Sequence, residues 1–208
     1  MPPNRIDPFP KEWNDETMDN TPTKHFSAPI ATVNTALLPI GIELMSSWMN
    51  DCDELIFMLD ISGSMRVKTP FSPEATKFNT MKNMVFHFMN TLKTNVQLGL
   101  ITVGGSCESE PSLKIGTSAS RRTLSNALQT IEADGYTAIS RSLRYAPELF
   151  EGDSKKKAIL FITDGTDSCL PDETCNLSIW LGTQNIALHV LAFSEKKTLL
   201  LNIKPTTV

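Results

Sequence analysis

Residues 57–65 read Phe57-Met58-Leu59-Asp60-Ile61-Ser62-Gly63-Ser64-Met65, an apolar run that ends in an acid and a turn of two serines around a glycine. The run begins at Glu54-Leu55, and its apolar character is typical of a strand that is covered on both faces. Gly63 lets the backbone bend closely. The two serine hydroxyls, two residues apart, can then point the same way above the carboxylate of Asp60. This stretch predicts a buried strand that ends in a cluster of oxygen atoms.

A second apolar run further along the chain also ends in an acid. Residues 158–165 read Ala-Ile-Leu-Phe-Ile-Thr-Asp-Gly, so that Asp164 follows its run as Asp60 follows the first. Apolar periodicity predicts strands over 54–60, 96–103, 112–115, 158–163 and 186–193, and helices over 37–49, 73–92, 121–131, 138–150 and 174–183. This alternation predicts an α/β fold with a doubly wound, mainly parallel sheet flanked by helices.

The two acids are expected to share one crevice. In a doubly wound sheet, ligands bind at the carboxyl ends of the strands, near the point where the strand order reverses. Asp60 and Asp164 both stand at such ends. The hydroxyl of Thr137, in a glycine turn before a predicted helix, completes an all-oxygen set with Ser62 and Ser64. Hard oxygen ligands with one or two carboxylates suit Mg²⁺, and Mn²⁺ also fits.

An ordinary helix N-cap is the alternative interpretation of the Asp-x-Ser-x-Ser stretch, since serine side chains often accept hydrogen bonds from free backbone N–H groups. Three further features favour the metal site: the buried strand before the stretch, the glycine turn at Thr137 and the strand that ends in Asp164. Two more acids, Asp167 and Asp172, are expected in a solvated loop. Met65 and Arg66 follow the serines and are expected at the rim of the site.

Three motifs in this order resemble the von Willebrand factor A domain, the fold also found as the inserted domain of integrins. They are the Asp60-Ile61-Ser62-Gly63-Ser64 signature, the threonine loop at residues 135–139 and the aspartate loop at residues 162–165. The resemblance covers residues 54–194. It implies a metal-ion-dependent adhesion site in which Ser62, Ser64 and Thr137 are hydroxyl ligands, and Asp60 and Asp164 act directly or through water. A carboxylate of a partner protein would complete the shell.

These features predict a protein-protein binding module, not an enzyme, that grips an acidic residue of a partner through Mg²⁺ or Mn²⁺. A phosphatase of the haloacid dehalogenase type needs a second Asp two residues after its nucleophile, where this chain has Ser62. A Gly-x-Ser-x-Gly elbow and a Walker-type loop are both absent. Two alternatives stay open: a Mg²⁺-dependent hydrolase of the phosphatase type, and a structural scaffold in an intracellular assembly that uses a face without the metal.

Length and composition bound the class of protein. The 208 residues suggest one domain plus modest extensions, and the 40% hydrophobic residues can build a buried core. A net charge of −4 argues against a nucleic-acid binder, which usually shows a basic face. No stretch reaches the roughly 18 apolar residues of a membrane-spanning helix. The first residues lack the order of a signal peptide, which predicts a cytoplasmic protein; an extracellular or periplasmic location stays open if a leader is missing.

The chain divides into a proline-rich, irregular arm with a short helix at 1–50 and the A-type domain at 51–208. Little sequence follows the strand predicted at 186–193, and Ile203-Lys204-Pro205 reads as a fragment of a last edge strand. The domain is therefore minimal, part of a longer protein, or completed by another chain.

Four cysteines leave the redox state open. Cys169 and Cys175 are close enough in sequence to form a small disulfide loop, whereas Cys52 and Cys107 stand apart. A pair with this spacing and no neighbouring His does not fit a zinc site.

Overall fold

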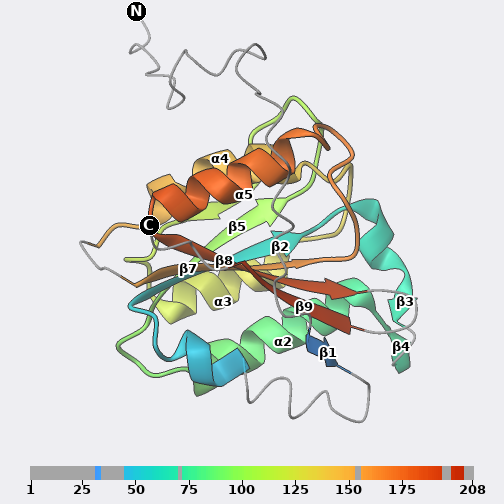
Figure 1. Ribbon diagram of the computed structural model, residues 1–208. Coiled ribbons are helices and arrows are strands. Elements are labelled where there is room, and N and C mark those ends of the chain that lie inside the picture. The colour runs from blue at the N-terminus through green and yellow to red at the C-terminus, as the bar shows by residue number, and fades with distance from the viewer. Residues whose placement is uncertain (1–30, 34–44, 70–71, 153–155, 194–197, 204–208) are drawn as a thin grey trace, which may run out of the picture.

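The computed structural model describes residues 31–33, 45–69, 72–152, 156–193 and 198–203. Within these residues, a central sheet has the strand order β1-β9-β8-β7-β2-β5-β6, and β3 and β4 form a separate antiparallel pair (Figure 1). The strands are β1 Ala31–Val33, β2 Glu54–Asp60, β3 Lys68–Thr69, β4 Ser72–Thr76, β5 Gln97–Val103, β6 Lys114–Ile115, β7 Lys157–Thr163, β8 Ile186–Phe193 and β9 Thr198–Ile203. Four of them, β2, β5, β7 and β8, are parallel neighbours, and β1, β6 and β9 pair antiparallel.

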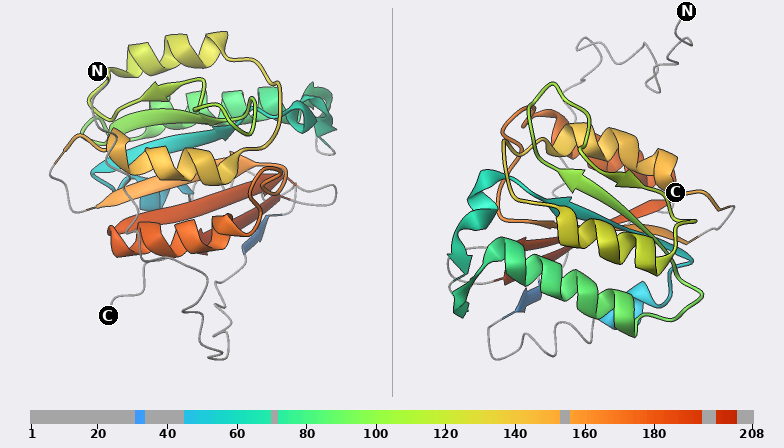
Figure 2. Two further views of the ribbon diagram at one scale, coloured as in Figure 1. Left: turned by 90° about the horizontal axis from the view of Figure 1, so that it is seen from above. Right: turned by 180° about the vertical axis from the view of Figure 1, so that it is seen from behind.

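Helices cover both faces of this sheet. They are α2 Lys77–Thr91, α3 Arg121–Thr130, α4 Ile139–Tyr145 and α5 Glu173–Thr183, with short 3-10 turns η3 Gly63–Arg66 and η4 Ala146–Leu149. Residues 45–49 are also helical. In Figure 1, α4 and α5 lie on one side of the sheet and α2 and α3 on the other, and Figure 2 shows the same layers from two further directions.

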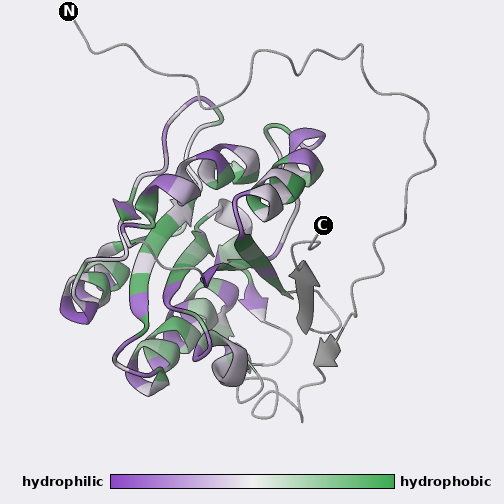
Figure 3. Ribbon diagram, turned by 60° about the vertical axis from the view of Figure 1, so that its left-hand side comes forward, coloured by the Kyte–Doolittle hydropathy of each residue, from purple (hydrophilic) through white to green (hydrophobic). Residues whose placement is uncertain are grey.

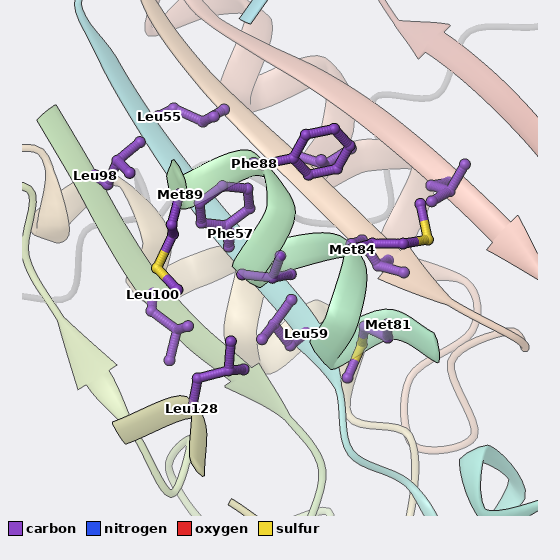
Figure 4. Close-up of a cluster of buried hydrophobic side chains, with 14 of the residues drawn as sticks. Leu55, Phe57, Leu59, Met81, Met84, Phe88, Met89, Leu98, Leu100 and Leu128 are labelled. Carbon is purple, nitrogen blue, oxygen red and sulfur yellow. The ribbon is translucent and has the colours of Figure 1, made fainter. Parts of the chain in front are cut away.

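Strand β2 shows why the sheet is buried on both faces. Alternate side chains of a strand point to opposite faces. Leu55, Phe57 and Leu59 pack in the cluster under α2 and α3, which Figure 4 shows, whereas Ile56 and Met58 pack in the cluster under α4 and α5. The hydrophobic residues accordingly gather on the central strands (Figure 3). The apolar run that begins at Leu55 therefore fills two cores at once.

The position of β2 in the sheet also determines where a ligand can bind. The chain runs from β2 to β5 on one side and later returns to β7 on the other side of β2. The strand order therefore reverses at β2, and the crevice expected in such sheets opens beside its carboxyl end. Asp60 is the last residue of β2, and Thr163 is the last residue of its neighbour β7.

The predicted α/β fold is confirmed, and the strands predicted at 54–60 and 186–193 have the expected bounds. The helix predicted over 73–92 begins later, at Lys77, because Ser72–Thr76 forms a strand and the Thr76 side chain caps the helix by accepting from the Asn79 backbone N–H at 3.1 Å. Only residues 45–49 of the helix predicted at 37–49 are described.

The last strand differs from its prediction. Ile203 ends β9, whereas Lys204 and Pro205 lie outside the described residues. Strand β9 is not at the edge of the sheet, because β1, from the predicted N-terminal arm, pairs with its far side. The domain boundary at residue 50 stays a prediction.

Candidate functional site

Asp60 lies buried at the carboxyl end of β2 and is 0% exposed. Its Oδ1 accepts a hydrogen bond from the Ser62 backbone N–H at 2.8 Å, and its Oδ2 accepts one from the Thr163 hydroxyl at 2.5 Å. Burial raises the pKa of Asp60 above its ordinary 3.8, and the nearby charge of Asp164 raises this pKa further; hydrogen bonds from Ser62 and Thr163 oppose the rise. The surroundings of Asp60 thus disfavour the ionised form of its carboxylate.

The serine turn joins Asp60 to Asp164. The Ser62 and Ser64 hydroxyl oxygens are 3.0 Å apart, and the Ser64 hydroxyl donates to Asp164 Oδ1 at 2.8 Å. Asp164 directly follows β7, so the two acids stand at the ends of adjacent parallel strands. Four of the five predicted ligands therefore lie in one hydrogen-bonded group.

Thr137, the fifth predicted ligand, is buried in a loop that packs against the serine turn. The Gly63 backbone N–H donates to the Gly135 carbonyl at 3.0 Å, and the Asp134 N–H donates to the Ile61 carbonyl at 2.5 Å. Gly135 has a φ of 83°, and a Cβ there would lie 2.5 Å from the Gly105 carbonyl oxygen, so this close approach requires glycine. These hydrogen bonds bring the loop of Thr137 to the turn; they do not by themselves place its hydroxyl among the other four groups.

Ser168 fixes the backbone of Thr137 from the other side. Its hydroxyl accepts from the Thr137 N–H at 2.9 Å, and its own N–H donates to the Thr137 carbonyl at 2.9 Å. Ser168 belongs to the loop that begins at Asp164. The loops that carry Thr137 and Asp164 are therefore attached to each other as well as to the serine turn.

Lys77 is a charged residue at this site that the sequence analysis missed. Its ammonium nitrogen lies 2.6 Å from Asp164 Oδ2, and the exposed fractions of the two side chains are 14% and 1%. Its backbone N–H donates to the Val67 carbonyl at 2.9 Å. The sequence indicates only that a lysine lies near the start of a helix, soon after the serine turn, and this does not predict which acid it pairs with.

A disulfide joins two loops at the same edge of the sheet. It connects Cys107, after β5, to Cys169, after β7, across a sequence separation of 62 residues. The small disulfide loop between Cys169 and Cys175, which the sequence left open, does not form: Cys175 is a free, exposed thiol on α5. The loops that follow different parallel strands meet at one edge of the sheet. A disulfide between two such loops therefore forms here in place of one between cysteines that are close in sequence. Cys52 is also free, and burial, with the charges of Asp51 and Asp53, raises its pKa to about 11.

Asp167 is buried, so the prediction that it lies in a solvated loop is wrong. Its carboxylate accepts from the backbone N–H groups of Ser140 at 2.6 Å, Cys169 at 2.8 Å and Leu170 at 2.9 Å. Burial acts to raise the pKa of Asp167, but these bonds outweigh burial, and the pKa lies below its ordinary 3.8. Asp167 therefore ties the loop of Asp164 to the start of α4. Asp172 is exposed, as expected.

The predicted rim residues behave differently from each other. Met65 is buried and packs in the core under α2, so its prediction as a rim residue is wrong. A 3-10 turn begins at Gly63, and its spacing directs Met65 inward. Arg66 is exposed, donates through Nε to the Ala133 carbonyl at 2.7 Å, and forms a 2.9 Å ion pair with Asp134.

The chemistry of this edge is that of oxygen donors. Among the described residues, no three His, Cys, Asp or Glu side chains gather where they could hold a metal ion. The predicted set differs in kind, since it combines two carboxylates with three hydroxyls. No helix in the described ranges has the length and apolar character needed to cross a membrane.

Comparison with known proteins identifies relatives of this chain and solved structures with a similar fold. An uncharacterised protein of Bacillus subtilis (strain 168), YwmC, is 28% identical over 155 residues, which cover 67% of this chain and 66% of that protein; this chain thus spans just under two thirds of its relative. The crystal structure of BatB from Bacteroides thetaiotaomicron superposes with a TM-score of 0.55 at 23% identity, covering 67% of this chain and 65% of that one.

A second structure is proximal thread matrix protein 1 of the mussel byssus, solved with a zinc-occupied MIDAS motif, the metal-ion-dependent adhesion site. It superposes with a TM-score of 0.54 at 18% identity over 67% of this chain and 35% of that one. At such identities both structures show the fold alone. The family model of the von Willebrand factor type A domain matches residues 55–166, more than half of the chain and the part that runs from β2 past Asp164. The chain therefore belongs to the von Willebrand factor type A family.

Proposed function

We propose that Asp60, Ser62, Ser64, Thr137 and Asp164 bind a divalent metal ion, Mg²⁺ or Mn²⁺, and that the protein uses this site to bind an acidic side chain of a partner protein. Domains of this family generally serve as interaction modules. The proposal assigns a binding role and no catalytic step to these residues.

The state of Asp60 is the observation that carries this proposal. Its carboxylate is fully buried, and both of its oxygens accept hydrogen bonds from neutral donors. Among the described residues, no Lys or Arg side chain pairs with it. Removing an ionised group from water costs several kcal/mol unless an opposite charge compensates. A bound cation beside Asp60 supplies that charge.

The remaining donors fit the same ion. Carboxylate and hydroxyl oxygens are hard ligands, and the set offers two negative charges at most. The hydrogen bonds among Ser62, Ser64 and Asp164 hold three of these groups together before an ion arrives. When bound, the ion supplies two positive charges, which the two carboxylates balance formally; because its other ligands are neutral hydroxyls, the ion can still accept a further carboxylate as a ligand. The mussel protein with zinc at its MIDAS motif supports a divalent ion in this family.

The surface around the site supports a protein partner. Large exposed apolar side chains that gather on one surface mark interaction sites. Val67, Tyr136 and Leu170 are 58%, 63% and 39% exposed. Each stands on a different loop of the same edge: Val67 after the serine turn, Tyr136 beside Thr137, and Leu170 after Asp164. We propose that these side chains contact the residues that flank the partner's acid.

The disulfide bears on location. Disulfides persist in oxidising compartments and are rare in the cytosol. The Cys107–Cys169 bond therefore favours the extracellular or periplasmic alternative over the cytoplasm. Thiol labelling of protein taken directly from its source checks this: Cys107 and Cys169 should resist alkylation until a reductant is added.

Isothermal titration of metal-stripped protein with MgCl₂ and MnCl₂ tests the metal site. We expect saturable binding in the wild type and none in the double variant Asp60→Ala, Ser62→Ala. The matched control Asp51→Ala, Ser118→Ala removes an exposed acid before β2 and an exposed serine next to Thr117, which contacts Glu54 at the opposite end of β2, and should bind as the wild type does. Absence of binding in the wild type, or unchanged binding in the Asp60 variant, would overturn the proposal.

A peptide library tests the partner's chemistry. Immobilised peptides with a single central Asp or Glu between apolar residues are probed with the labelled protein in MgCl₂ and again in EDTA. We expect retention on acidic peptides in MgCl₂ only, and none on the matched Asn and Gln peptides. Equal retention in EDTA would show that the protein binds through another surface.

A further inference from the structure

The Lys77–Asp164 pair brings a cation of the protein itself to the proposed metal site. The two oxygens of Asp164 have different partners: Oδ1 accepts from the Ser64 hydroxyl at 2.8 Å, and Oδ2 lies 2.6 Å from the Lys77 ammonium. Both side chains are largely removed from solvent, which strengthens their attraction. The ammonium therefore compensates the charge of one proposed ligand, whereas no Lys or Arg in the described part of the chain pairs with Asp60.

Lys77 has little reason to be at this position other than Asp164. It is the first residue of α2, and a positive charge at a helix N-terminus is unfavourable because it opposes the helix dipole. Its backbone is fixed there, since its N–H donates to the Val67 carbonyl and the Thr76 side chain caps the helix. The β3–β4 hairpin before it connects the serine turn to α2 (Figure 1). The start of α2 is thus held where the lysine reaches the Asp164 loop.

We propose that Lys77 is an internal cation that competes with the divalent ion for Asp164 and thereby sets the metal affinity of the site. This inference rests on the proposed function. Lys77 is a positioning residue and not a ligand, because an ammonium group has no lone pair to offer. Without metal it holds Asp164 and the attached loop in place. When metal binds, its charge opposes the incoming ion, so the same residue stabilises the metal-free protein and weakens metal binding.

The substitution Lys77→Met tests both effects, because it keeps the length and apolar stem of the side chain and removes the charge. Titration with MgCl₂ should show binding about 10-fold tighter than in the wild type, as expected when a unit positive charge is removed a few ångströms from the ion. In EDTA, the melting temperature of the variant should fall by about 2–4 °C, since the buried Asp164 loses its partner. The two readouts should therefore move in opposite directions.

Two control variants separate pairing from net charge. Lys77→Arg keeps the charge beside Asp164 and should stay within about threefold of the wild-type affinity, because the opposing charge remains. Lys82→Met removes a positive charge from the same helix, where the ammonium donates to the carbonyls of Gln129 and Ile131 and not to a proposed ligand. Its effect on metal affinity should be smaller than about twofold, since distance and screening weaken its field.

The outcomes distinguish this inference from the proposed function. If the wild type binds Mg²⁺ and Lys77→Met binds with equal or lower affinity, Lys77 does not compete and the inference is overturned, whereas the metal site stands. If Lys77→Met binds Mg²⁺ and the wild type does not, the competition between Lys77 and the metal is confirmed, whereas the proposed function of the wild-type protein, which requires metal binding, is overturned. If neither protein binds, the proposed function fails and the inference fails with it.

Discussion

Strand β2 carries a buried acid at each end, and the two acids have different surroundings. Glu54, at the start of the strand, accepts hydrogen bonds from the Thr117 hydroxyl and from the Gly152 N–H at 3.0 Å, and the Lys157 ammonium lies 3.9 Å from its Oε2. Asp60, at the other end, accepts from neutral donors and has Asp164 as its acidic neighbour. Glu54 thus has a lysine as its charged neighbour, whereas Asp60 has a second acid, and the lysine at that end, Lys77, pairs with Asp164.

This difference shows which buried acid is suited to a ligand. A buried carboxylate with hydrogen bonds and a lysine is compensated within the protein, so Glu54 fits a structural role. At the other end, Lys77 pairs with Asp164, and among the described residues no Lys or Arg side chain pairs with Asp60. The pKa of Asp60 is raised by burial and by the charge of Asp164. Perturbed pKa values of this kind cluster at functional sites. Burial alone would not have distinguished these two residues, since both are fully buried.

The largest effect we expect comes from the disulfide, which constrains only the Asp60 end of the strand. The double variant Cys107→Ser, Cys169→Ser should lose about 4 kcal/mol of unfolding free energy, because the unfolded chain regains the freedom of a long loop. Urea unfolding of the variant and the wild type measures this loss. Cys175→Ser, which removes a free thiol, serves as the control. Equal stability of the wild type with and without a reductant would show that the bond contributes nothing.

Matched substitutions at the two ends test the comparison directly. In EDTA at pH 7, Glu54→Gln should lower the unfolding free energy by about 2 kcal/mol, because a paired, buried carboxylate is lost. Asp60→Asn should leave it unchanged or raise it by up to about 1 kcal/mol, because a raised pKa means that the charged form opposes folding at this pH. Added MgCl₂ should stabilise Glu54→Gln and not Asp60→Asn. Similar losses for both variants in EDTA would remove the distinction between the two ends.

The buried Asp167 gives a contrasting pH dependence at the same edge as Asp60. Its pKa is lowered below 3.8, so its ionised form stabilises the fold above that pH, and this contribution is lost as the pH falls through the lowered pKa. Asp167→Asn should cost about 1.5 kcal/mol at pH 7, with the difference from the wild type shrinking below about pH 4. Thermal unfolding at pH 7, 5 and 3 measures it. A constant difference across this range would contradict the assignment.

The smallest effect is expected where an acid of the same edge is exposed. Asp134 pairs with Arg66 at 2.9 Å, with most of both side chains in solvent. Exposed ion pairs contribute little because water and salt screen them. Asp134→Ala should therefore shift the melting temperature by about 1–2 °C at most, as differential scanning calorimetry can measure. A larger shift would mean that this pair supports the loop of Thr137.

Much of the fold could be predicted because its signals are local. The runs that became β2, β7 and β8 are largely apolar, and the stripe of α3 repeats at helical spacing. The predicted start of α2, at Pro73, is wrong because proline is compatible with the first turn of a helix as well as with a strand. Pairing with β3 makes this segment a strand. The pairing of β4 with β3 leaves no periodic pattern of apolar residues in the sequence, so it could not be predicted.

The sequence by itself determined that Asp60 and Asp164 end two strands, because the alternation of apolar runs and helices allows few other folds. It also contained the three motifs and the family to which they belong. Only the tertiary structure decided what each group contacts: Lys77 pairs with Asp164, Cys107 bonds Cys169, and Asp167 caps the start of α4. The physical reason is that the conformation of a strand follows from its own residues, whereas the partner of a charge or a thiol depends on which distant loops the completed sheet brings to one edge.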